Sequence, residues 1–197
     1  METFGTFILA ALALTGSPGP NTLSLAAVGA AFGRVRGFRY MIGLNLGVFI
    51  VIGVVGSGVS GLVLAIPGAA PVIAILAALY FMYLAYRIAT APPVQQDQDV
   101  GNEPKWYEGV VVSLLNPKAY AAMAALFSSF TLISGDHLSD SITKALALGL
   151  TIMFVNACWL YAGSILTTYM TQDRSSRIIN IVFASLLIIS VIAAAFL

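Results

Sequence analysis

The chain has 197 residues, of which 59% are hydrophobic and 9% are charged, and its formal net charge is +1. A soluble domain carries about 25% charged residues, so this chain cannot cover itself with a water-compatible surface, and we expect an integral membrane protein. Its single cysteine excludes an internal disulfide, and its single histidine leaves no cluster for a transition metal. The sequence gives no sign of a cofactor or of a nucleic-acid partner.

Six apolar stretches are long enough to cross a bilayer, which needs about 20 residues per helix. They are Phe4–Phe32, Arg39–Leu64, Ala69–Ala89, Glu108–Leu132, Thr143–Tyr169 and Arg177–Leu197. Because no Lys or Arg precedes Phe4, we interpret the first stretch as a retained helix rather than a cleaved signal. A turn at Ile66–Gly68 separates the second stretch from the third. The sequence therefore predicts an all-α polytopic membrane protein with six transmembrane helices.

A polar linker, residues 90–107, divides the chain into a first half, 1–89, and a second half, 108–197. Lys and Arg collect on the cytoplasmic side of membrane proteins. Every Lys and Arg except Lys118 and Lys144 falls on one side if the N-terminus is outside. We therefore expect both termini outside and the linker in the cytoplasm.

Helix breakers interrupt the first and fourth stretches, at Ser17–Asn21 and Asn116–Lys118. Proline removes a backbone donor and clashes with the preceding turn, and its favoured helical position is the first, behind a capping residue such as Asn. With the expected topology the two halves have opposite orientations, so the chain is predicted to form two inverted three-helix repeats with broken first and fourth helices. In such repeats the broken helices meet at a substrate site near the membrane midplane. The alternative for Pro18–Asn21 is a structural kink.

The interiors of these stretches contain one charged side chain, Lys118. It lies roughly 15 Å along its helix from Glu108, and a charge at that depth costs at least about 2.5 kcal/mol. No Asp or Glu lies in the interior of any stretch to pair with it. We expect its partner to be a substrate carboxylate, held also by the positive ends of the restarted helices, while carbonyls at Ser17–Gly19 receive the substrate ammonium. The alternative is that Lys118 extends along its helix to the interface.

Asn45 and Asn156 lie inside the second and fifth stretches. Intramembrane asparagines usually form interhelical hydrogen bonds, and a direct contact with substrate is the alternative. The candidate substrate-binding and transport residues are Ser17, Pro18, Gly19, Pro20, Asn21, Asn45, Asn116, Pro117, Lys118 and Asn156.

Two motifs resemble signatures of a known family. The first is Pro18–Asn21 followed by Gly33–Arg34, Gly37, Gly43 and Gly47, and the second is Leu114–Lys118. Together they resemble the LysE/RhtB family of bacterial amino-acid exporters, over the whole chain. The chain further resembles the branch of this family that exports cysteine and O-acetylserine, at Asn156, Cys158–Trp159, Ala162–Gly163 and Asn180–Val182. The chain departs from many members at Ser128–Ser129, where they have Pro-Gln, and this bears on substrate identity.

The resemblance implies a multi-pass protein of the bacterial inner membrane that exports neutral or basic amino acids or close derivatives, by antiport with protons. Its expected partners are the amino-acid substrate and the lipid bilayer. Six helices make only a thin wall around a cavity, so a homodimer is a further expectation. The alternative function is a passive channel for small polar solutes. An enzyme is not expected, because an intramembrane hydrolase needs a nucleophile with a base, and His137, the one histidine, lies in a predicted loop.

Overall fold

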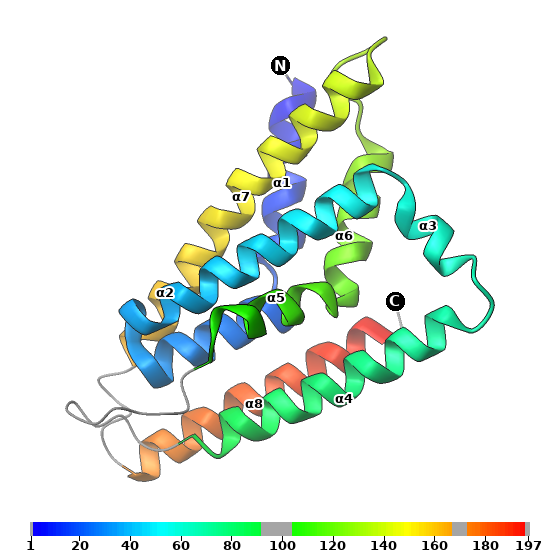
Figure 1. Cartoon of the computed structure of the whole chain (residues 1–197). Helices are drawn as coiled ribbons and strands as arrows, with labels where there is room; N and C mark the ends of the chain where they lie inside the picture. The colour runs from blue at the N-terminus through cyan, green and yellow to red at the C-terminus, as the bar shows by residue number, and fades with distance from the viewer. Residues whose placement is uncertain (1, 92–103, 167–172, 196–197) are drawn as a thin grey trace.

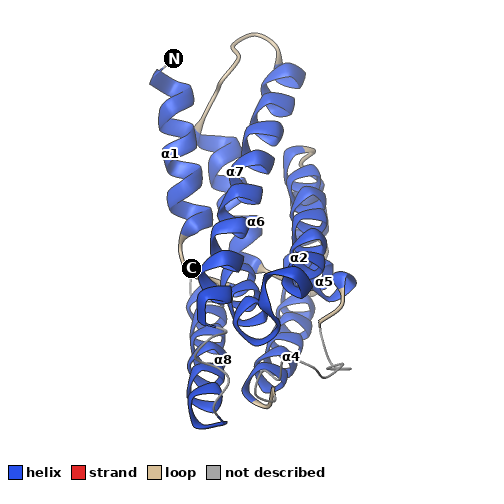
Figure 2. Cartoon of the chain, turned by 90° about the vertical axis from the view of Figure 1, so that its left-hand side faces the viewer, coloured by secondary structure: helices blue, strands red, loops and turns tan. Residues whose placement is uncertain are grey.

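The structure is a computed structural model that describes residues 2–91, 104–166 and 173–195. Within these ranges the regular structure is entirely helical, as Figures 1 and 2 show, which confirms the all-α prediction. The helices are α1 (Glu2–Gly16), α2 (Pro20–Gly56), α3 (Val59–Leu64), α4 (Ala69–Ala89), α5 (Trp106–Leu114), α6 (Pro117–Ser129), α7 (His137–Ile165) and α8 (Asp173–Ala195).

Helix α2 is the centre of the fold, because it packs against α5, α6, α7 and α8, while α4 and α8 pair along one edge (Figure 1). One buried apolar cluster joins α2, α4 and α8 around Phe81 and Leu187. A second cluster joins α1, α2, α6 and α7 around Phe7 and Met123. Leu115 packs against the first cluster and Leu114 against the second. The connection between α5 and α6 is therefore held by both clusters.

Several helices are long and apolar enough to cross a membrane. In the described part of the chain they are Pro20–Gly56, Ala69–Ala89, His137–Ile165 and Arg174–Ala193. Helices α5 and α6 pass the same test as a pair bent by 60°, and α1 is a shorter apolar helix. These four or five candidate spans agree with a multi-pass membrane protein. They do not by themselves confirm the six-span inverted repeat.

The first two predicted stretches, Phe4–Phe32 and Arg39–Leu64, leave residues 33–38 between them as a connection. That connection is shorter than predicted, because Gly33 alone departs from the helical conformation. Gly33 has φ 72° and ψ 173° inside α2, a conformation that glycine adopts at low cost. The chain is helical before and after Gly33, and at this residue it folds back on itself (Figure 1). A Cβ built on Gly37 would lie 3.7 Å from Val28 Cγ1, which places the two arms of α2 in contact.

The second stretch also ends earlier than predicted. Helix α2 stops at Gly56 rather than continuing to Leu64, because Gly58 adopts a positive φ of 76° and α3 then begins as a separate short helix. The predicted turn at Ile66–Gly68 is confirmed: Gly68 has φ 83° and the Ala69 N–H donates to the Ile66 carbonyl.

The fifth stretch begins before the predicted Thr143, because Asp136 caps α7. The Asp136 side chain accepts hydrogen bonds from the backbone N–H groups of Leu138 and Ser139. Most of the predicted linker, residues 92–103, lies outside the described residues. The division into halves, the positions of the termini and the homodimer stay predictions.

A buried ion pair joins α7 to the end of α6. Asp140 lies 2.7 Å from the Lys144 ammonium group, one turn away on α7. The same carboxylate accepts hydrogen bonds from the backbone N–H groups of Leu132 and Ile133, and Lys144 donates to the Phe127 carbonyl. A buried ion pair is tolerated when such additional hydrogen bonds satisfy both groups. The pair therefore fixes the connection between α6 and α7.

Backbone contact between α2 and α5 depends on glycine. A Cβ on Gly43 would collide with the Trp106 carbonyl, and a Cβ on Gly109 would lie 2.5 Å from the Tyr40 carbonyl oxygen. A Cβ on Gly47 would lie 2.6 Å from Ser113 Cβ. Small residues at helix interfaces allow this close approach in membranes. The contact sets the position of α5, and hence of the α5–α6 break.

We predict that Gly43→Ala destabilises the protein, because the new methyl group meets backbone that cannot rotate away. Overpacking costs about 1–3 kcal/mol. The measurement is the temperature at which the detergent-solubilised protein loses its monodisperse peak. Gly53→Ala is the matched control, since Gly53 lies in the same helix with open space around its Cβ position. Equal midpoints for the two variants would show that the close approach is not required.

Candidate functional site

The first break separates α1 from α2 at residues 17–19. Pro20 is the first residue of α2, and Gly19 caps it in an extended conformation with φ −171° and ψ 178°. Glycine offers no side chain as a cap, so Thr22 substitutes: its hydroxyl accepts from the Gly19 N–H at 2.9 Å and donates to the Gly19 carbonyl at 3.1 Å. At the other side of the break, Trp159 Nε1 donates to the Gly16 carbonyl at 3.2 Å.

The second break separates α5 from α6 and is capped as predicted. Pro117 is the first residue of α6, and the Asn116 side-chain oxygen accepts from the Lys118 backbone N–H at 3.1 Å. Asn116 is buried. Helix breaks are therefore present at both of the motifs where the sequence predicts them.

The two breaks meet through side-chain amides. Asn116 Nδ2 donates to Asn21 Oδ1 at 2.9 Å, and Asn21 Nδ2 donates to Ser113 Oγ at 3.1 Å. Ser113 Oγ in turn donates to the Leu44 carbonyl at 2.9 Å. Freed polar groups are tolerated at membrane depth only when they are satisfied in this way or face a wet cavity. One continuous network thus connects both breaks to the second arm of α2.

Lys118 crosses from the second break to the first. Its ammonium group donates to the Ser17 carbonyl at 2.6 Å, to the Ser17 hydroxyl at 2.7 Å and to the Pro18 carbonyl at 3.2 Å. These groups follow the C-terminal end of α1, where the helix dipole favours a cation. Extension along its own helix to the interface is therefore not what Lys118 does. Its hydrogen-bond partners in the described structure are neutral oxygens, which the sequence did not predict.

A cavity of about 50 Å³ lies between the breaks. Its apolar lining includes Val48, Met123 and Ile152, and its polar lining is contributed by Thr15, Gly19, Asn21, Thr22, Asn116, Lys118 and Asn156. The first turns of α2 and α6 both border it, so two helix N-termini are beside the Lys118 side chain. A water needs about 10–15 Å³ of such volume. The cavity therefore has room for a few waters and must widen to hold a larger ligand.

Asn45 and Asn156 form a direct pair between α2 and α7. Asn156 Nδ2 donates to Asn45 Oδ1 at 2.7 Å, and the two residues are 2% and 9% exposed, with Asn156 the more buried. The interhelical hydrogen bond expected from the sequence is thus present. Asn156 also lines the cavity, whereas Asn45 does not.

Three residues of this network were missed by sequence reasoning. Thr22 could have been found, because a hydroxyl three residues after a capping position is a local signal. Ser113 and Trp159 could not, since their partners are Asn21, Leu44 and Gly16, far away in the sequence.

Comparisons with known proteins identify the family of this chain. The family model described as LysE type translocator matches residues 12–197. Relatives described as cysteine/O-acetylserine efflux protein occur in Escherichia coli strain K12 and in Shigella flexneri, each 27% identical over 173 residues, which is 87% of this chain and 87% of the relative. No solved structure matches the chain. Because the family model covers nearly all of the sequence, the chain belongs to the LysE type translocator family.

Proposed function

We propose that this translocator exports an amino acid or a close derivative across the bacterial inner membrane, with cysteine and O-acetylserine as the first candidates. The substrate class follows the printed names of the relatives. The observation that carries the proposal is the Lys118 ammonium group, which lies between two capped helix breaks with neutral partners. A translocator is a transporter, in line with the expectation that the chain is not an enzyme.

The proposed topology has six spans. The first comprises α1 and the arm of α2 before Gly33, and the second is the remainder of α2. The third is α4, the fourth is the bent pair α5 and α6, and the last two are α7 and α8. The non-helical Gly33 and the 60° bend support this division. The two broken spans then head inverted halves, with both termini outside and the basic end of the bundle in the cytoplasm.

The proposed binding mode uses both charges of an amino acid. The substrate carboxylate binds the Lys118 ammonium group and the N-terminal N–H groups of α2 and α6, which favour an anion. The substrate ammonium group takes the carbonyls of Ser17 and Pro18 that Lys118 holds in this structure. Binding therefore moves Lys118 away from the first break. The cavity widens when α1 and α6 separate, and closure on the opposite side completes alternating access.

Proton coupling is part of the proposal. Lys118 is the titratable side chain that borders the cavity in the described structure. Lys118 keeps its proton while its ammonium group binds the substrate carboxylate, so we place the proton exchange after the substrate has left the site.

We predict saturable exchange in liposomes that contain the purified protein. Labelled O-acetylserine or cysteine should accumulate faster when the same unlabelled substrate is on the opposite side, because a carrier returns faster when loaded. Cysteamine, which lacks the carboxylate, should not compete. Flux that rises linearly with concentration and ignores the opposite side would instead establish a passive channel.

We predict that Lys118→Met lowers the exchange rate about tenfold or more. A hydrogen bond to a charged group contributes about 1.5–3 kcal/mol, and 1.4 kcal/mol is a factor of ten. Methionine keeps the apolar length of the side chain but not its charge. The measurement is the initial exchange rate at several substrate concentrations, with a monodisperse detergent peak as the control for folding. Exchange at the wild-type rate would remove Lys118 from the site.

We predict that Gly19→Ala lowers exchange several-fold while the protein stays folded. The new Cβ would lie 2.8 Å from Lys118 Cδ and 3.1 Å from Nζ, so it displaces the ammonium group from Ser17. The extended backbone at Gly19 accepts alanine without strain. Gly16→Ala is the matched control, since nothing lies near its Cβ position. The same rate in both variants would contradict the importance of the Lys118 position.

A further inference from the structure

One wall of the cavity plays no part in holding the charged groups of an amino acid. We call it the side-chain wall, and it consists of Val48 from α2, Met123 from α6, and Ile152 and Asn156 from α7. Ile152 and Asn156 are one turn apart and share a face of α7. Because the carboxylate and ammonium groups of the substrate occupy the two breaks, its side chain is left to meet this wall.

Most of the side-chain wall is apolar and tightly held. Val48, Met123 and Ile152 are 4%, 1% and 6% exposed, and all three belong to one buried cluster. Side chains in a packed interior leave few gaps between them. The wall therefore favours a substrate with a short side chain.

Asn156 gives this wall a hydrogen-bonding atom that the protein does not use. Its side-chain nitrogen donates to Asn45 Oδ1 at 2.7 Å, but no described residue donates to its own Oδ1 atom. Asn156 is 2% exposed and lines the cavity. Its Oδ1 is nevertheless not among the described polar atoms that are both fully enclosed and unpartnered, which belong to Tyr40, Ser176 and Asn180. The free oxygen therefore opens onto the cavity.

The amide pair can offer either kind of hydrogen bond. Asn156 presents its oxygen in this structure, and that oxygen can accept from a thiol or a hydroxyl group. If both amides turn over, Asn45 Nδ2 donates to Asn156 Oδ1, and Asn156 Nδ2 faces the cavity as a donor for an ester carbonyl. The Thr15 hydroxyl also lines the cavity, but its hydrogen is already bonded to the Ala11 carbonyl at 2.7 Å.

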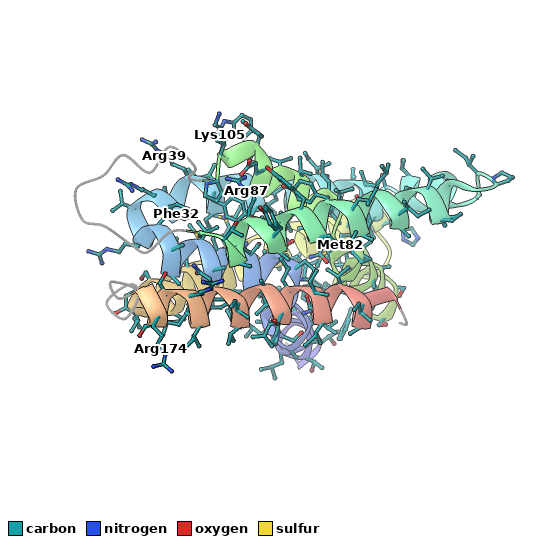
Figure 3. All side chains as sticks on the ribbon, turned by 90° about the horizontal axis from the view of Figure 1, so that it is seen from below. Phe32, Arg39, Met82, Arg87, Lys105 and Arg174 are labelled. Atoms are coloured by element: carbon teal, nitrogen blue, oxygen red, sulfur yellow. The ribbon has the colours of Figure 1, made fainter. Side chains whose placement is uncertain are left out.

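The charges around the cavity favour a substrate without net charge. Lys118 is the cation in its lining, and no described Asp or Glu lines it. Arg39, Lys105 and Arg174 lie at one end of the bundle (Figure 3), outside this lining. A second ammonium or guanidinium group on the substrate would be buried without a counter-charge, which is costly.

Resting on the proposed function, we propose that Asn156 determines substrate specificity by binding the polar atom of the substrate side chain. Asn45 holds the Asn156 amide, and the apolar members of the side-chain wall limit the length of the substrate. The substrate class is then small, neutral amino acids whose side chain carries a hydrogen-bonding group. An apolar side chain would leave the Asn156 oxygen covered and unsatisfied.

The test measures competition for the exchange of labelled cysteine or O-acetylserine in liposomes that contain the purified full-length protein. The competitors form two matched pairs. Cysteine is compared with 2-aminobutyrate, which has a methyl group in place of the thiol, and O-acetylserine with norleucine, whose chain has the same length without the ester oxygens. We expect the polar member of each pair to compete about fivefold more strongly, the effect of one hydrogen bond. Lysine should compete least.

The double variant Asn45→Leu, Asn156→Leu should bring the members of each pair within about twofold of each other. Replacing both partners by residues of similar shape leaves neither amide unsatisfied, so the protein should fold. Thr151→Val is the matched control and should keep the wild-type preference. Thr151 is buried on α7 next to Ile152 but outside the cavity lining, and its hydroxyl donates to the Ala147 carbonyl at 2.8 Å.

Equal competition by the members of a pair in the wild-type protein would overturn the role of Asn156, whether or not any variant folds. An unchanged preference in the double variant would also overturn it, as would loss of all exchange in a folded double variant, since the amide pair would then serve transport itself. Competition by lysine as strong as that by cysteine would overturn the neutral class. In each of these outcomes the wild-type protein still exchanges amino acids and the proposed function stands, whereas a wild-type protein without exchange overturns both.

Discussion

The structure depends on how two interrupted helices satisfy the polar groups that the interruptions free. In an apolar environment each unsatisfied group costs several kcal/mol, so neither break is tolerable alone. Here the second break supplies donors for the first: Lys118 donates to the Ser17 and Pro18 carbonyls, and the Asn116 amide donates to the Asn21 side-chain oxygen. The polar centre of the protein is thus a consequence of the breaks meeting.

Close helix packing at glycine residues brings the two breaks together. One arm of α2 touches α5 at Gly43, and the other arm touches α7, where a Cβ on Gly163 would collide with the Ala26 carbonyl. The two arms are joined by the single non-helical residue Gly33, where the chain folds back, so the positions of both contacts are tied to each other. Helix α7 brings Asn156 and Trp159 to the site, and α5 brings Ser113. Glycines therefore set the distances between these helices, and the polar side chains form hydrogen bonds across them.

Much of this centre was predictable, since its signals are local. A proline behind a capping residue marks a helix start wherever it occurs, so the breaks at Pro20 and Pro117 followed from the sequence. The reversal at Gly33 did not, because several glycines nearby have ordinary helical backbone and only tertiary packing selects one. Asp140 and Lys144 stand one turn apart in the sequence, but their burial depends on how α6 returns to α7. Partners distant in sequence, such as Ser113 and Asn21, were out of reach for the same reason.

The two lysines of the second half differ in whether a nearby carboxylate neutralises their charge. Lys144 lies against a carboxylate and is neutralised within its own helix. Lys118 lies against carbonyl and hydroxyl dipoles, which satisfy its hydrogen bonds but leave its charge. A simple anion could neutralise Lys118 only by pulling it from the carbonyls, which would then lack a donor. An amino acid brings a carboxylate for the lysine and an ammonium group for the carbonyls. It can therefore replace the internal contact without leaving either partner unsatisfied, which is the chemical basis for the proposed substrate class.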